Sequence, residues 1–120
     1  MIKSYEDLIV WQKAVAFAEE IYRLQRTLPR EERFGFGDQI RRAAVSIPSN
    51  IAEGFGRDSA KEFLRFLAIA RGSLYEVRTQ LRIASDLGLL KSIVEVEPLA
   101  EEVGRLLNAF IVKLRSTPTH

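Results

Sequence analysis

Apolar side chains recur at helical spacing along almost the entire chain. In the first segment two such rows run side by side, which is the pattern of a helix with a wide apolar face. One row contains Leu8, Trp11, Val15, Ala18 and Tyr22, and the other contains Ala14, Phe17, Ile21, Leu24 and Leu28. Ser4 can cap the start of this helix, with Asp7 in the position of a capping box, and Pro29 ends it.

The next two segments also have helical patterns, and glycines mark their ends. The second helix is expected from about Asp38 to Glu53, with Pro48 inside it, where a proline removes one backbone hydrogen bond and favours a kink. Gly54 and Gly56 then break this helix. The third helix is the longest, from about Ser59 to Leu87, and repeats apolar residues every seven positions. Gly72 interrupts it at a cost of about 1 kcal/mol relative to alanine, which either a close helix crossing or simple tolerance explains.

A fourth helix is expected from about Val96 to Arg115, after a turn at Gly88. Acidic residues gather at its start and basic residues at its end, which suits the helix dipole. No segment has the alternating pattern of a strand. Four helices with short connections predict an all-α fold, an antiparallel up-down-up-down four-helix bundle. The length of 120 residues fits one domain, residues 1–120, with a tail that frays from about residue 116.

Composition excludes several classes of function. The chain has no cysteine, so it has no ligands for a thiolate zinc site. Its only histidine is the terminal His120, so no internal histidine is available for catalysis. Serine nucleophiles have no base, and neighbouring carboxylates on a helix point about 100° apart. We therefore expect no enzyme activity, no catalytic residue, no metal and no cofactor. No apolar run approaches the roughly 20 residues that cross a bilayer, and the first residues do not form a signal peptide, which predicts a cytoplasmic protein without a membrane partner.

Basic residues outnumber acidic ones only slightly, 18 to 16, which gives a net charge of +2. When the chain is divided into four consecutive segments, the largest excess, +2, lies in residues 58–91, which contain the predicted third helix. There Tyr75 lies beside three arginines on one helix face. Arginines interleaved with an aromatic residue suit phosphate contact and base stacking, although an ordinary solvated helix face explains the same pattern. The candidate nucleic-acid-binding residues in and next to this helix are Arg57, Lys61, Arg65, Arg71, Tyr75, Arg78 and Arg82, and the predicted second helix adds Arg41 and Arg42.

The predicted second helix carries a polar stripe opposite its apolar face. The members of this stripe are Arg42, Ser46, Ser49 and Glu53, with Asn50 adjacent. Such groups form a hydrogen-bonding surface for a ligand or a partner chain, or else a solvated face whose serines bond back to backbone carbonyls. Among the aromatic residues, Trp11, Phe34 and Phe36 are interpreted as packing residues rather than ligand-binding ones.

One run in the predicted second helix resembles a known family signature. Residues 41–54 read RRAAVSIPSNIAEG and resemble the signature of the four-helix-bundle proteins named after intervening sequences in bacterial 23S ribosomal RNA genes. Residues 8–14 (LIVWQKA), 61–67 (KEFLRFL) and 70–76 (ARGSLYE) resemble the start and the third helix of that family. The resemblance covers about residues 5–114, and only the GFG at residues 35–37 departs slightly from the usual loop.

The resemblance implies an antiparallel four-helix bundle, commonly assembled as a ring-shaped homopentamer. It also implies kinship with the accessory protein of diversity-generating retroelements, a basic barrel that binds nucleic acid and a reverse transcriptase. It supplies no catalytic residue. The polar positions that match the family motifs are Arg41, Arg42, Ser46, Ser49, Asn50, Glu53, Arg57, Lys61, Arg65 and Arg71.

Two non-enzymatic functions follow as hypotheses. The first is an adaptor that binds RNA or DNA through the basic row, which a ring would repeat. The second is a scaffold that recruits a protein, such as a reverse transcriptase, through the polar stripe. Apolar surface beyond the needs of one core predicts a homo-oligomer, and with the resemblance a pentamer. On the third helix this surface is a side row of Leu64, Ile69, Ile83 and Leu87.

Overall fold

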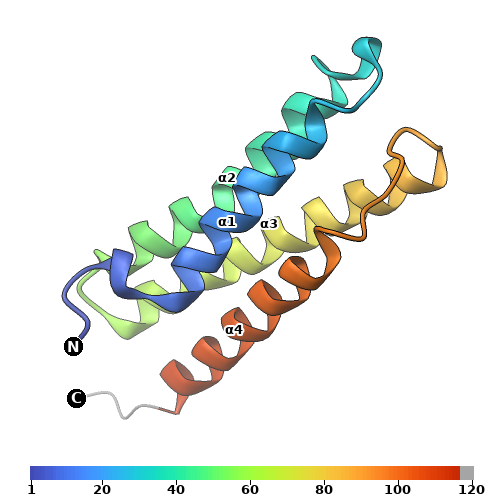
Figure 1. Ribbon diagram of the computed structural model, residues 1–120. Coiled ribbons are helices and arrows are strands. Elements are labelled where there is room, and N and C mark those ends of the chain that lie inside the picture. The colour runs from blue at the N-terminus through green and yellow to red at the C-terminus, as the bar shows by residue number, and fades with distance from the viewer. Residues whose placement is uncertain (117–120) are drawn as a thin grey trace.

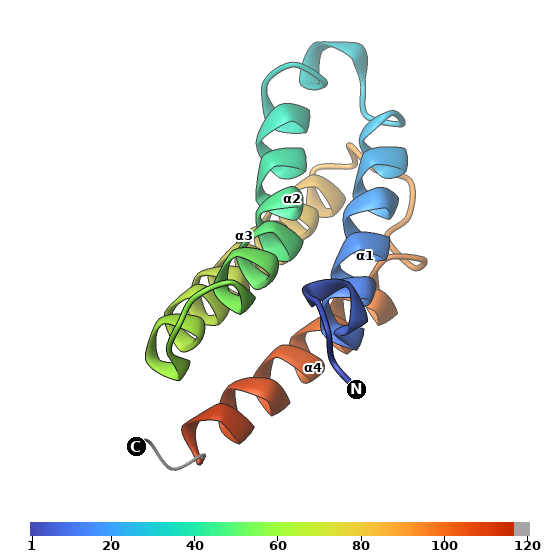
Figure 2. The same cartoon turned by 90° about the vertical axis from the view of Figure 1, so that its left-hand side faces the viewer.

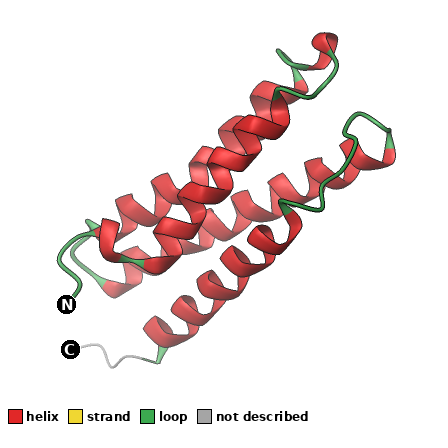
Figure 3. Ribbon diagram, in the orientation of Figure 1, coloured by secondary structure: helices red, strands yellow, loops and turns green. Residues whose placement is uncertain are grey.

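The computed structural model describes residues 1–116 and consists of four α-helices and two short 3-10 turns. The helices are α1 (Ile9–Gln25), α2 (Phe36–Phe55), α3 (Ala60–Asp86) and α4 (Glu97–Arg115), and the turns are η1 (Tyr5–Asp7) and η2 (Arg30–Glu32). The described residues contain no β-strand, as Figure 3 shows. The all-α prediction is therefore confirmed. The predicted fraying of the tail and the terminal His120 concern residues outside the described part of the chain.

The helices form a four-sided bundle in which each helix runs antiparallel to the next (Figures 1 and 2). Each packs on its neighbour in the chain, and α1 also packs on α4, which closes the bundle. The molecule measures 52 × 22 × 21 Å. At one end the α1–α2 connection projects as a tip, apart from the α3–α4 loop. Because of the order around the bundle, the outer face of α1 and α2 lies opposite the outer face of α3 and α4.

The core lies where the apolar stripes of the four helices meet. Of the two apolar rows expected on α1, the one that contains Phe17 and Ile21 faces the core, and both of these side chains are fully buried. The other row is only partly buried, and Tyr22 at its end is 42% exposed. The other large, fully buried side chains are Leu28, Ile47, Ile51, Leu67, Leu74, Val77, Leu81, Val103, Leu107 and Ile111.

The ends of α1 differ from the sequence-based expectation. The expected capping box is present, because the Ser4 hydroxyl accepts from the backbone of Glu6 and the Asp7 carboxylate accepts from the backbone N–H of Ser4. It closes the separate turn η1, so α1 itself begins only at Ile9. At the other end α1 stops at Gln25, before the proline, because the chain tightens into a turn held by hydrogen bonds from Thr27 to the carbonyl of Leu24.

Of the two glycines predicted to break the second helix, Gly56 caps its end, but the prediction was wrong for Gly54. Gly54 lies inside α2, which continues through Pro48 to Phe55. A Cβ on Gly54 would lie 2.7 Å from the Cβ of Phe66 and 2.9 Å from the Cδ1 of Phe63, so the glycine lets α3 approach α2 closely. Gly72 has the opposite environment. No atom lies within 4 Å of a Cβ built there, which favours tolerance over a close crossing within this chain.

Candidate nucleic-acid interface

Part of the polar stripe of α2 takes part in a contact with α3, and the rest of the stripe lies on the surface. The Ser46 hydroxyl lies 2.9 Å from the Ser73 hydroxyl of α3, and the amide of Asn50 donates to the carbonyl and the hydroxyl of Ser46 at 2.7 and 2.9 Å. Ser46, Ser73 and Asn50 are all half-buried. These groups are therefore engaged between α2 and α3 rather than offered to a ligand, and the serine bonds across helices instead of back to its own.

The remaining members of the stripe are exposed. Glu53 pairs with Arg57 at 3.0 Å, one helical turn later. Ser49 and Arg42 lie on the surface, and Arg42 forms no ion pair within residues 1–116. The stripe expected from the sequence is therefore not one continuous surface.

The arginine row of α3 does lie on one face, along the edge that α3 shares with α4. Its three guanidinium groups are each held by one partner, Asn108 for Arg71 (3.1 Å), Glu97 for Arg78 (3.5 Å) and Asp86 for Arg82 (3.0 Å). Tyr75 lies within the row and is 51% exposed. Together with Thr79 and Ile83, the residues Tyr75, Arg78 and Arg82 line a shallow hollow on this face.

A second basic group surrounds Phe66 near the start of α3. The guanidinium carbons of Arg57 and Arg65 each lie 4.7 Å from the centre of the buried Phe66 ring, within the range of a cation–π contact. Arg65 also pairs with Glu62 at 3.4 Å. Lys61 is exposed and forms no ion pair within the described part of the chain. Arg57 and Arg65 thus cover the ring of Phe66 instead of extending the arginine row of α3.

The two motif arginines on α2 lie on the opposite side of the bundle from the row of α3. Arg41 pairs with Asp38, donates to the buried Gln25 side chain of α1 at 3.4 Å, and lies over the Tyr22 ring at 5.6 Å. Arg42 beside it is exposed. The sequence-predicted basic residues therefore occupy three separate places: the edge of α3, the surroundings of Phe66, and the α1–α2 face.

A family model confirms the relationship that the motif residues indicate. The model of the 23S rRNA-intervening sequence proteins matches residues 6–109, which include α1, α2, α3 and most of α4. The chain belongs to the 23S rRNA-intervening sequence protein family. Among curated proteins no match to this chain is found. The family signature at residues 41–54 covers most of α2, from Arg41 at the α1 contact to Gly54 at the close approach to α3. Much of what this signature encodes is thus the packing of the intervening-sequence fold.

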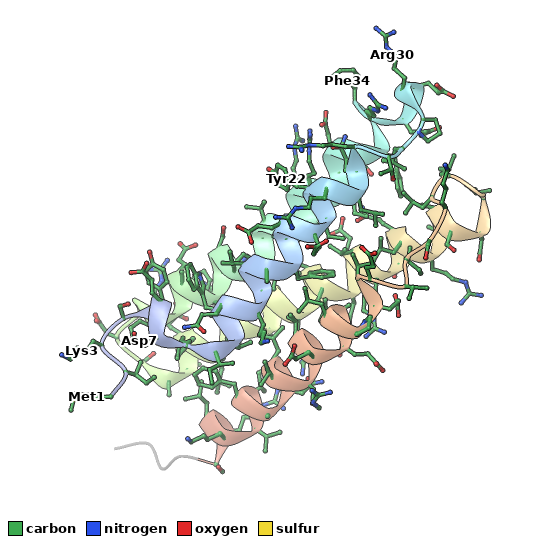
Figure 4. The ribbon with its side chains drawn as sticks, viewed as in Figure 1. Met1, Lys3, Asp7, Tyr22, Arg30 and Phe34 are labelled. Atoms are coloured by element: carbon green, nitrogen blue, oxygen red, sulfur yellow. The ribbon has the colours of Figure 1, made fainter. Side chains whose placement is uncertain are left out.

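Sequence reasoning missed a second aromatic and basic surface, on the α1–α2 hairpin of this family member. Phe34, expected to pack, is 82% exposed at the tip, whereas Trp11 and Phe36 are half-buried against the core as expected. Tyr22 lines two adjoining hollows along the two helices, one with Arg42 and Asp38 and the other with Arg26 and Glu19. Figure 4 shows Phe34 and Arg30 at the tip, with Tyr22 further down the hairpin. A charge count over residues 22–45 carries the signal that could have located this surface, because six arginines face three acidic residues there.

Residues 1–116 contain no group of three acidic or histidine side chains that could hold a metal ion. Within the same residues, no helix has both the length and the apolar character needed to span a membrane.

Proposed function

We propose that this protein binds RNA or DNA, without catalysing a reaction, through a surface built on Arg71, Tyr75, Arg78 and Arg82. The observation that supports the proposal is the continuity of the row. These four side chains follow one another on a single exposed face of α3, with the aromatic ring between the arginines. Arginine donors and an accessible ring are the groups that contact phosphates and bases.

The partners of the arginines leave donors available. A guanidinium group has five N–H donors, and Arg71 and Arg78 each use one terminal nitrogen on α4. Arg82 uses its Nε on Asp86 within the same helix. The partners hold the long side chains in place, which lowers the conformational entropy lost when a phosphate binds.

The same partners make a single chain a weak anion binder. Glu97 and Asp86 offset two of the three arginine charges, and the whole chain has a net charge of only +2. Non-specific affinity grows with the number of phosphates neutralised. The proposal therefore includes a cyclic homo-oligomer, a pentamer, in which repeated rows add their fields within a Debye length of about 8 Å.

Substitutions in the row test the proposal. We expect Arg82→Gln and Tyr75→Ala to weaken the binding of the intact oligomer to labelled RNA of several sequences by a similar factor. Arg82→Gln should also lower the slope of log affinity against log salt by about 1 for each phosphate that is no longer neutralised. Fluorescence anisotropy over a salt series measures both quantities. Arg82 is suited to this test because its one partner within residues 1–116, Asp86, lies one turn away on the same helix.

Arg115→Gln is the matched control, because it removes one arginine charge from an exposed position at the end of α4 that is not part of the row of α3. It should leave affinity and slope unchanged. If the row variants behave like this control while the unaltered protein binds RNA, the row is a solvated helix face. If the unaltered protein binds no nucleic acid at all, the scaffold hypothesis takes precedence, although Ser46 and Asn50 are already bonded within the chain.

A further inference from the structure

The hairpin tip surface, which consists of Tyr22, Arg26, Phe34 and Arg42, has features that the α3 row lacks. Phe34 is 82% exposed, the highest exposure of any aromatic side chain in the described residues. It extends from the connection that projects from the end of the bundle (Figure 4). An exposed phenylalanine forgoes the burial that stabilises other aromatic residues, so its position at a projecting tip calls for an explanation outside the chain.

The backbone next to Phe34 is held in place. The buried Gln25 amide donates to the carbonyl of Arg33 at 3.2 Å, and the Arg33 Nε donates to the carbonyl of Leu28 at 3.0 Å. A Cβ on Gly37 would lie 2.7 Å from the Gln25 amide nitrogen, so this glycine lets the start of α2 close against α1. The loop therefore presents Phe34 from a fixed base, and the ring is exposed because of the way the loop is built.

The hairpin segment that carries these rings has a positive net charge. Residues 22–45 contain six arginines and three acidic residues, a net charge of +3, which exceeds the +2 of the whole chain. Arg23 and Arg41 pair with carboxylates. Within residues 1–116, ion pairs are absent at the other four, Arg26, Arg30, Arg33 and Arg42. Arg26 lies about one turn from Tyr22 along α1, and the packing of α2 against α1 brings Arg42 into a hollow that Tyr22 also lines.

We infer that the hairpin tip surface binds an unpaired segment of nucleic acid, with Phe34 stacked on a base and Arg26 and Arg42 on the flanking phosphates. This inference rests on the proposed nucleic-acid binding and adds single-strand preference to it. Accessible aromatic rings beside arginines that carry no carboxylate partner form a stacking platform with an electrostatic groove. Within a duplex the base faces are already stacked, so Phe34 gains a partner only where bases are unpaired.

The experiment compares a fluorescently labelled RNA single strand with a blunt duplex of the same sequence. Stacking on one aromatic side chain contributes about 1–3 kcal/mol per base, so Phe34→Ala should weaken single-strand binding by roughly tenfold and leave duplex binding nearly unchanged. Phe34→Trp should retain binding. Phe34→Leu separates two explanations, because leucine is apolar but has no ring, and it should weaken single-strand binding as alanine does.

Arg42→Gln tests the phosphate contact. It should weaken single-strand binding and lower its salt slope by about 1. Ile9→Ala, at an exposed apolar position at the other end of α1, is the control and should change nothing. Circular dichroism and thermal unfolding of each variant confirm that the bundle is intact, as expected for side chains on the surface.

The outcomes separate this inference from the proposed function. If Phe34→Leu keeps full single-strand affinity, the tip is an apolar contact rather than a stacking site and the inference is wrong. If Phe34→Ala and Arg42→Gln leave single-strand binding unchanged while Arg82→Gln weakens it, the row of α3 is the interface and the tip is not. If the unaltered protein binds neither RNA, both proposals fail together.

Discussion

Gly54 and Gly72 lie in neighbouring helices, and their surroundings decide what each glycine does. Gly54 is buried under Phe63 and Phe66, where a methyl group has no room. Gly72 is exposed, with open space around it. Both glycines lower helix propensity by about 1 kcal/mol relative to alanine. Only at Gly54 does the absence of a side chain allow a contact between helices in return.

Alanine substitutions at these two positions should therefore have opposite effects. Gly72→Ala should raise the free energy of unfolding by about 0.5–1 kcal/mol, because it gains helix propensity and meets no atom. Gly54→Ala should lower it by about 1–3 kcal/mol, because the added carbon forces α2 and α3 apart. Urea denaturation measures both changes. A gain in stability for Gly54→Ala would contradict the close approach of the two helices.

The interface between α2 and α3 contains several half-buried or buried polar side chains. Ser46, Ser73 and Asn50 form one half-buried hydrogen-bonded group there. Gln80 lies further along the same side of α3, two helical turns beyond Ser73, and is 9% exposed. Its Oε1 has no hydrogen-bond partner within residues 1–116. The interface therefore contains a satisfied polar contact and an unsatisfied polar atom on one side of the same helix.

The serine pair predicts a coupling between substitutions on the two helices. Ser46→Ala and Ser73→Ala should each destabilise the bundle by about 1 kcal/mol, because each leaves a half-buried partner without its bond. The double variant should cost less than the sum, by about 0.5–1.5 kcal/mol, because the shared bond is removed only once. A double-mutant cycle from urea denaturation measures this difference. Additive effects would show that the two hydroxyls do not interact.

The unsatisfied amide oxygen predicts a stabilising substitution. Gln80→Met keeps the length of the side chain and removes the buried polar atoms, so the free energy of unfolding should rise by about 1 kcal/mol. Glu76→Met on the exposed face of α3 is the control and should change stability little. Loss of stability in Gln80→Met would indicate that the amide makes a contact worth keeping, such as one through a bound water molecule.

At the scale of the whole molecule, surface apolar residues accompany the separated basic surfaces. Of the side row expected on α3, Ile69, Ile83 and Leu87 are exposed and Leu64 is half-buried. The three exposed side chains are not part of the core. Ile69 and Ile83 lie on the helix that also carries the arginine row, and Leu87 caps its end. The surface we propose for assembly and the surface we propose for binding are therefore neighbours.

The proposed oligomer predicts a mass well above that of one chain. Light scattering at micromolar concentration should give a multiple of 13.7 kDa for the unaltered protein. Replacing both Ile69 and Ile83 by Glu should shift the mass to one chain, because charges then lie at the contact, while the helical content is retained. A single 13.7 kDa species for the unaltered protein would end the ring hypothesis.

The sequence by itself determined the helices and the limits on the chemistry. Helix formation depends on periodicity, caps and prolines, which are local, so the four segments and the all-α class were predicted correctly. The absence of cysteine and internal histidine is visible without any fold. The family motif identified the relationship, and it marked Ser46 and Gly54 without showing that both contact residues of α3.

Only the tertiary structure decided which side chains of different helices lie against one another. Ser46 and Ser73 are 27 positions apart in sequence, and their contact exists because α2 and α3 pack side by side. Gly54 reads as a helix end until the rings of Phe63 and Phe66 occupy the space beside it. The positive charge of the α1–α2 hairpin is spread over two helices and a loop, and it becomes one surface only when the hairpin closes. Such contacts depend on how the side chains of one helix fit against those of another, and the local sequence pattern of each helix does not contain this information.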